Sequence, residues 1–150
     1  MEAAVRKQTE DQSQWVTFQM DQERYGINVL QVQEIIRMTD ITPVPGAPRY
    51  ILGVINLRGN VVPIVNTRSR FNLPTVDDSP ETRIILVDLD RQLIGIVVDS
   101  VAEVVTLESG EIEKAPSLDK AEWVQFIHGV ARTGGDLLIL LDLSKFLSEI

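Results

Sequence analysis

The chain has 150 residues, and 14 basic against 22 acidic side chains give it a net charge of −8, with no cysteine. That charge argues against a nucleic-acid partner, because affinity for phosphate backbones comes from Lys and Arg, and the missing cysteines exclude disulfides and cysteine-ligated metals. No apolar run reaches about 18 residues, so no direct membrane insertion is expected.

In the first half, the polar residues 1–13 are predicted to form a disordered tail. Apolar alternation predicts strands at 15–20 and 24–29, joined by a turn, and Gly26 in the second strand favours a bulge or a tight bend. The segment 30–36 is too short for periodicity to decide between a helical turn and a strand. Three prolines then mark 41–48 as a loop.

Two further strands are predicted at 53–59 and 60–66, joined near Arg58-Gly59-Asn60. Pro63 favours an edge strand or a bulge at that point. A short helix is expected at 67–71, capped by Asn66 or Thr67. The second half is predicted to hold strands at 83–89, 92–98, 102–107, 124–132 and 136–143, and a closing helix at 144–150 capped by Asp142 or Ser144.

The second half repeats the first. At an offset of 69, identical residues coincide at Asp21, Gly26, Ile27, Val29, Val32 and Glu34 with Asp90, Gly95, Ile96, Val98, Val101 and Glu103. At an offset of 76, Gly53, Val54 and Gly59 coincide with Gly129, Val130 and Gly135. The sequence therefore predicts two copies of one module, at about 14–72 and 82–150, with an insertion of seven residues within 106–125.

Five short strands in each copy are best accommodated by a small closed barrel, which leaves few exposed edges. The runs 94–98 and 137–141 are apolar at every position, so they are expected to be buried on both faces where the two lobes meet. Val97 and Leu140 are therefore predicted core residues. The expected fold is all-β, with two barrels that share one interior.

The sequence offers little for catalysis. His128 is the only histidine and lies in an apolar strand, so no catalytic triad can be assembled around it. The aspartate pairs at 77–78 and at 88 and 90 are most simply turn residues, and no glycine-rich phosphate-binding motif is present. We predict no enzyme activity, no metal site and no cofactor.

One motif of the first copy has no counterpart in the second. Residues 56–59 are Asn-Leu-Arg-Gly, where the second copy has Arg-Thr-Gly-Gly at 132–135. Arg58 should stand at the surface beside a hairpin turn, which suits an anchor for a protein partner. The alternative is a strand-end arginine paired with a nearby carboxylate. Because Glu34 and Val32 recur as Glu103 and Val101, their first interpretation is a structural one.

These residues resemble the CheW family of chemotaxis coupling proteins from about Trp15 onward. The resemblance rests on 24–36 (RYGINVLQVQEII), 53–71 (GVINLRGNVVPIVNTRSRF) and 94–105 (IGIVVDSVAEVV). Asn66 departs from the family, which usually has aspartate there. The resemblance implies two intertwined five-stranded SH3-like β-barrels with a few short helices in a CheW-like domain at 14–150.

The resemblance also implies a non-enzymatic cytoplasmic adaptor at membrane-associated receptor arrays. Its implied partners are the cytoplasmic tip of a methyl-accepting chemoreceptor, the regulatory domain of a CheA-type histidine kinase and, in array rings, other CheW-like domains. The implied receptor-binding residues are Arg58, Val32, Glu34, Val101 and Val104, and Gly53 and Leu118 are the implied kinase contacts.

Two other functions remain open from the sequence. The same module can serve another chemosensory system, such as pilus-based motility. The chain can also be a small β-barrel that binds a ligand or acts as an enzyme.

Overall fold

The computed structural model describes residues 11–114 and 126–148. Within the first copy it places β1 (Gln12–Met20), β2 (Glu23–Asn28), the 3-10 turn η1 (Val29–Gln31), β3 (Val32–Arg37), β4 (Ile51–Leu57), β5 (Asn60–Val65) and α1 (Thr67–Arg70). The second copy follows with β6 (Arg83–Leu89), β7 (Gln92–Val98), β8 (Ser100–Glu108), η2 (Ser109–Glu111), β9 (Ile127–Thr133), β10 (Asp136–Leu141) and α2 (Leu143–Phe146). The segment 30–36 is both a helical turn and a strand. β1 begins inside the expected tail, because Gln12 and Ser13 pair with β8.

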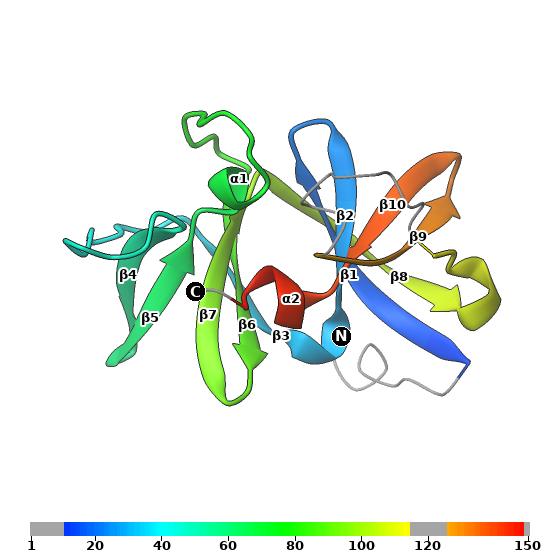
Figure 1. Cartoon of the computed structure of the whole chain (residues 1–150), viewed down its shortest axis with the longest axis horizontal. Helices are drawn as coiled ribbons and strands as arrows, with labels where there is room; N and C mark the ends of the chain where they lie inside the picture. Colours follow the sequence, from blue (N-terminus) through cyan, green and yellow to red (C-terminus); the bar gives the residue numbers. More distant parts are fainter. Residues whose placement is uncertain (1–10, 115–125, 149–150) are drawn as a thin grey trace.

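The strands form two five-stranded sheets, in the orders β8-β1-β2-β10-β9 and β3-β6-β7-β5-β4 (Figure 1). Exchanging each strand for its counterpart in the other sequence copy converts one order into the other. Each sheet therefore combines the first two strands of one copy with the last three strands of the other. We call the first sheet the Trp15 barrel and the second the Arg58 barrel. The strand orders confirm the predicted all-β fold of two intertwined five-stranded barrels.

Each barrel closes through one isolated bridge next to a glycine. Thr42, after β3, pairs with Val54 on β4, and Glu113, after β8, pairs with Val130 on β9. The backbone of Thr42 lies so close to Gly53 that any Cβ there would collide with the Thr42 carbonyl oxygen. Gly53 is therefore required for closure of the Arg58 barrel.

The repeated glycines of β2 and β7 allow the parallel pairs that join the two copies. Gly26 pairs with Leu140 of β10, and Gly95 pairs with Ile64 of β5. A Cβ on Gly95 would lie 2.6 Å from Ile64 Cδ1, and one on Gly26 would lie 3.2 Å from Leu140 Cδ2. The β1–β2 and β6–β7 registers run through these glycines without a shift. The expected bulge is therefore wrong, and the glycines make room for the barrel interior.

The apolar runs divide their side chains between two cores. Leu138 and Leu140 pack inside the Trp15 barrel, whereas Ile139 and Leu141 face the large cluster between the barrels. Val97 is half-buried and packs against the interior of the Arg58 barrel. Burial on both faces is thus confirmed for most of each run. Leu137 is the clearest exception, with 44% exposure, because it lies next to the Gly134-Gly135 turn of the β9–β10 hairpin.

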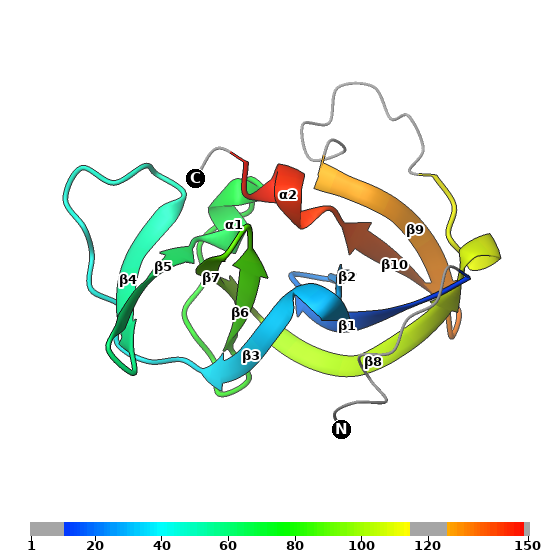
Figure 2. The same ribbon diagram turned by 90° about the horizontal axis from the view of Figure 1, so that it is seen from below.

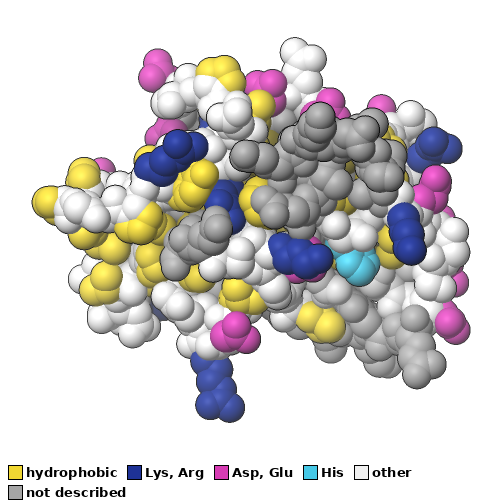
Figure 3. All heavy atoms as spheres, in the orientation of Figure 1, with side chains coloured by type: hydrophobic (Ala, Val, Ile, Leu, Met, Phe, Trp, Pro, Cys, Tyr) yellow, Lys and Arg dark blue, Asp and Glu magenta, His cyan; other side chains and the backbone are white. Residues whose placement is uncertain are grey.

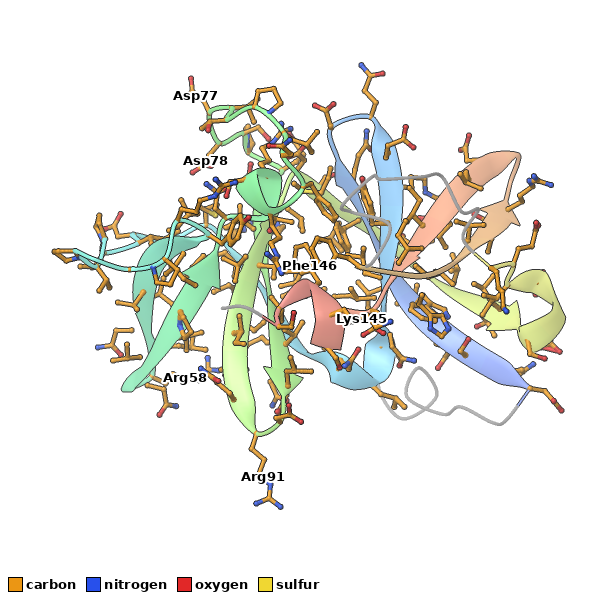
Figure 4. All side chains as sticks on the ribbon, viewed as in Figure 1. Arg58, Asp77, Asp78, Arg91, Lys145 and Phe146 are labelled. Atoms are coloured by element: carbon orange, nitrogen blue, oxygen red, sulfur yellow. The ribbon has the colours of Figure 1, made fainter. Side chains whose placement is uncertain are left out.

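Aromatic rings form the centre of the shared core. Tyr25 stacks between Phe18 and Phe71, and Phe71 and Phe126 both contact Phe146 of α2, which lies between the two barrels (Figure 4). Burial raises the pKa of Tyr25 to about 12, with Glu23 and Asp21 adding to the effect. The ring stack therefore joins strands and helices of both copies through one packed region.

The two short helices are capped alike. Asn66 Oδ1 accepts from the Ser69 amide and Asp142 Oδ1 accepts from the Lys145 amide, which confirms the capping prediction and shows that either residue serves. The second helix ends at Phe146, earlier than expected. Pro63 lies on an internal strand, contrary to the edge prediction. The β5–β7 pairing that the structure describes starts one residue later, at Ile64, so the missing N–H is tolerated.

Candidate functional site

Arg58 stands at the end of the β4–β5 hairpin of the Arg58 barrel (Figure 4). Its side chain is 68% exposed, and its backbone has a left-handed φ of 51°. Arg58 Nη2 donates to Glu34 Oε1 of β3 at 2.6 Å. This hydrogen bond and the charge of Glu34 raise the pKa of Arg58. The sequence left open whether Arg58 is a surface anchor or is paired with a nearby carboxylate. In the structure Arg58 is both exposed and paired.

Glu34 is the acidic member of this pair. Its side chain is 37% exposed, and Leu86 of β6 lies opposite it in the sheet. The repeated Glu103 has a different partner, Arg24, at 3.6 Å. The repetition of this glutamate therefore does not reflect one shared ion pair, because Gly134 takes the place of Arg58 in the second copy.

Further apolar side chains lie along β3 and β8, and we call them the apolar strip. The two strands are edge strands of the two barrels, and both lie on the lower side of the molecule in Figure 2. Val32 is buried in the core between the barrels, and Val101 and Val104 pack half-buried against that same cluster. The structure thus assigns Val32 chiefly to the core, whereas the other two valines also reach the surface.

Ile35 is a further residue of this strip that the sequence analysis did not identify. It is 40% exposed and follows Glu34 on β3, so its side chain points to the opposite face of the strand. Opposite it in the register is Ile85, which belongs to the central cluster. Its apolar side chain is left accessible because β3 is an edge strand, a property that appears only once the strand order is known.

Three further apolar side chains are exposed on β4, on β5 and in the loop before β4. Val61 is 72% exposed on β5, Leu52 is exposed on the edge strand β4, and Val44 is exposed in the preceding loop. Figure 3 shows hydrophobic side chains gathered over this end of the molecule. We call these three residues the Val61 patch.

Of the two predicted kinase contacts, only Gly53 lies within the described residues. Gly53 is buried and packed against Thr42, so any substitution there would act through barrel closure. Its neighbour Leu52 is the exposed residue of that segment. Leu118 lies outside the described residues. His128 is exposed, and its ring centroid lies 5.7 Å from that of Trp15.

A cavity of about 260 Å³ lies at the opposite end of the Arg58 barrel from Arg58, beside Asp77 and Asp78 (Figure 4). Arg68, in its wall, binds Asp99 at 2.7 Å and Asp21 at 3.5 Å. These contacts join α1 to the turns after β1 and β7. Arg68 and Asp99 of this cavity are therefore engaged in holding the two barrels together.

Within residues 11–114 and 126–148, no group of three or more His, Cys, Asp or Glu side chains is placed to hold a metal ion. In the same ranges, no helix has the length and apolar character needed to cross a membrane.

Comparison with known proteins identifies the family. The model of the CheW-like domain matches residues 14–150. The chain belongs to the CheW-like family. The chemotaxis protein CheW of Treponema pallidum is 34% identical over 144 residues, which cover 93% of this chain and 85% of that protein. The chemotaxis protein CheW of Klebsiella aerogenes is 35% identical, covering 91% of this chain and 82% of its own length.

The same relationship appears in three dimensions. The crystal structure of the scaffolding protein TtCheW from Thermoanaerobacter tengcongensis matches with a TM-score of 0.84 at 33% identity. The match covers 92% of this CheW-like chain and 93% of that one. The two SH3-like barrels are therefore the fold of a CheW-like protein.

Proposed function

We propose that this chain is a non-catalytic adaptor of a chemotaxis array, which joins the cytoplasmic tip of a methyl-accepting chemoreceptor to a CheA-type histidine kinase. Membership of the CheW-like family and the names of its relatives support this role. The observation that carries the receptor contact is the exposed Arg58–Glu34 pair, on the same strand β3 as the accessible Ile35. The proposed location is the cytoplasm, at the receptor array.

The geometry suits a receptor helix. The guanidinium of Arg58 has five N–H donors in a planar fork, and the bond to Glu34 engages Nη2. The rest of the fork, on a side chain that is 68% exposed, can bind a carboxylate or a carbonyl of the partner. Ile35, Val101 and Val104 would contact the apolar face of the helix, in the way that grooves receive amphipathic helices.

The kinase contact is proposed at the Val61 patch. Its residues are apolar and belong to the same barrel, on β4, β5 and the loop before β4 and not on β3 or β8. A partner with an apolar surface of its own, such as a regulatory domain of the same fold, would bury Val61 and Leu52. Two separate surfaces would let the adaptor hold both partners at once.

Two charge-introducing variants test this division. Arg58→Glu is expected to lower affinity for a receptor-tip fragment by about 30-fold or more, the range of an interface hot spot, while kinase-domain binding remains. Val61→Glu is expected to lower affinity for the kinase domain while receptor binding remains. Leu137→Glu is the matched control, since Leu137 is the counterpart of Val61 in the second copy and is also exposed. Titration calorimetry and thermal melts provide the measurements.

Unchanged receptor affinity in folded Arg58→Glu would place the receptor site elsewhere. Loss of both partners in either variant would show that the two surfaces are not separate. An equal effect of Leu137→Glu on kinase binding would remove the argument for the Val61 patch.

A further inference from the structure

The loop that carries Arg58 has only two residues. Leu57 pairs with Asn60, so Arg58 and Gly59 alone connect β4 to β5, and their φ angles are 51° and 89°. Two-residue hairpin loops with positive φ at both positions are type I′ turns, which favour Asn-Gly and Gly-Gly. An arginine at the first position is unfavourable, because its Cβ crowds the backbone in the left-handed region.

The second copy builds the same turn from glycine. Thr133 pairs with Asp136 across Gly134 and Gly135, whose φ angles are 59° and 86°. The two backbones therefore have nearly the same conformation. Since glycine satisfies this turn without strain, the arginine of the first copy provides something that the turn does not need, namely a guanidinium aimed at Glu34.

Asn56 supplies the bond that holds this turn. Its Oδ1 accepts from the Gly59 amide at 2.9 Å. The second copy has Arg132 at this position, and an arginine side chain has no acceptor atom. The acceptor is therefore present where the left-handed residue is an arginine, and it is missing where that residue is glycine.

We propose that Asn56 is a positioning residue for the partner-binding arginine: it holds the Arg58-Gly59 turn so that Arg58 keeps its left-handed backbone and its contact with Glu34. This inference rests on the proposed role of Arg58 in receptor binding. Without the bond, Arg58 relaxes toward negative φ and its guanidinium leaves β3. The side chain of Asn56 acts through Arg58 and makes no contact with the receptor.

The test compares Asn56→Ala with Asn56→Asp, which keeps the acceptor oxygen. Hydrogen exchange of the Gly59 amide, followed by NMR, is expected to speed up at least tenfold in Asn56→Ala and to stay slow in Asn56→Asp. Affinity for the receptor-tip fragment should fall about tenfold in Asn56→Ala and be retained in Asn56→Asp. In an Arg58→Ala background, Asn56→Ala should cause no further loss of affinity.

Each other outcome overturns the inference in a recognisable way. Unchanged Gly59 exchange in Asn56→Ala would show that the bond does not hold the turn, whatever the receptor does. Full receptor binding by Asn56→Ala, when Arg58→Glu has lost it, would leave the receptor site in place and remove the positioning role. A further loss in the Arg58→Ala background would assign Asn56 a general structural role. Undiminished binding by Arg58→Glu would refute the receptor site itself, and the positioning role with it.

Discussion

Adding one methyl group at the two equivalent glycines should have unequal effects. In Gly95→Ala the new Cβ would lie 2.6 Å from Ile64 Cδ1 and 2.8 Å from Ile84 Cγ2, and both isoleucines are fully buried. Overpacking of this kind costs about 1–3 kcal/mol. In Gly26→Ala the shortest contact is 3.2 Å, to the end of the flexible Leu140 side chain, so a small shift relieves it.

Both substitutions also restrict the unfolded chain, which stabilises the fold by about 0.4–1 kcal/mol. The net expectation is a loss of about 1–2 kcal/mol for Gly95→Ala and a change within about 0.5 kcal/mol for Gly26→Ala. Urea unfolding curves fitted with a common m-value give the change in the free energy of unfolding for each variant. Gly110→Ala is the control, because a Cβ there would have no atom within 4 Å. An equal or larger loss for Gly26→Ala would refute this account of the parallel pairs.

Three further predictions follow from the core, the ring stack and the turn. Leu140→Ala should lower the free energy of unfolding by about 2–5 kcal/mol in urea titrations, since Leu140 is fully buried, and a change below about 0.5 kcal/mol would contradict this. The pKa of Tyr25 in the folded state is about 12, above its ordinary value of 10. The neutral tyrosine therefore stabilises the folded state fully below pH 10, and this stabilisation is lost as the pH rises toward 12. Tyr25→Phe should make stability less dependent on pH in this window, and an unchanged slope would argue against it. Arg58→Gly should keep or raise the melting temperature, because glycine fits the left-handed turn, while receptor affinity falls; a lower melting temperature would show that the Glu34 pair stabilises the fold.

The repetition in the sequence predicted much of the local structure. The offset of 76 places β4, β5 and α1 onto β9, β10 and α2 with the same boundaries. It could not predict which strands share a sheet, because alternation identifies the buried face of a strand and not its neighbour. The exposure of Leu137 and Ile35 follows from position at a hairpin end or on an edge strand, so apolar character alone gave no warning of it.

The sequence proposed residues for the candidate site but not the contact between Arg58 and Glu34. Arg58 was identified because its motif occurs once, and Glu34 because it lies in a matching segment. Their contact joins residues 24 positions apart and depends on the fold that brings the hairpin to β3. The proposed role of Asn56 could have been inferred from the sequence, since Asn56 offers a side-chain acceptor three residues before Gly59 and Arg132 of the second copy offers none.

The exchange of strands between the two copies also bears on how such a chain could arise. Neither copy contains a complete barrel, so a single module could bury its strands only by pairing with a second one. Two identical chains of about half this length would form the same two barrels as a symmetric dimer, with the parallel β2–β10 and β5–β7 pairs at its interface. In that dimer both hairpins would carry the same residues. A fused chain does not have this restriction, so one hairpin can hold Gly134 while the other holds Arg58 and Asn56.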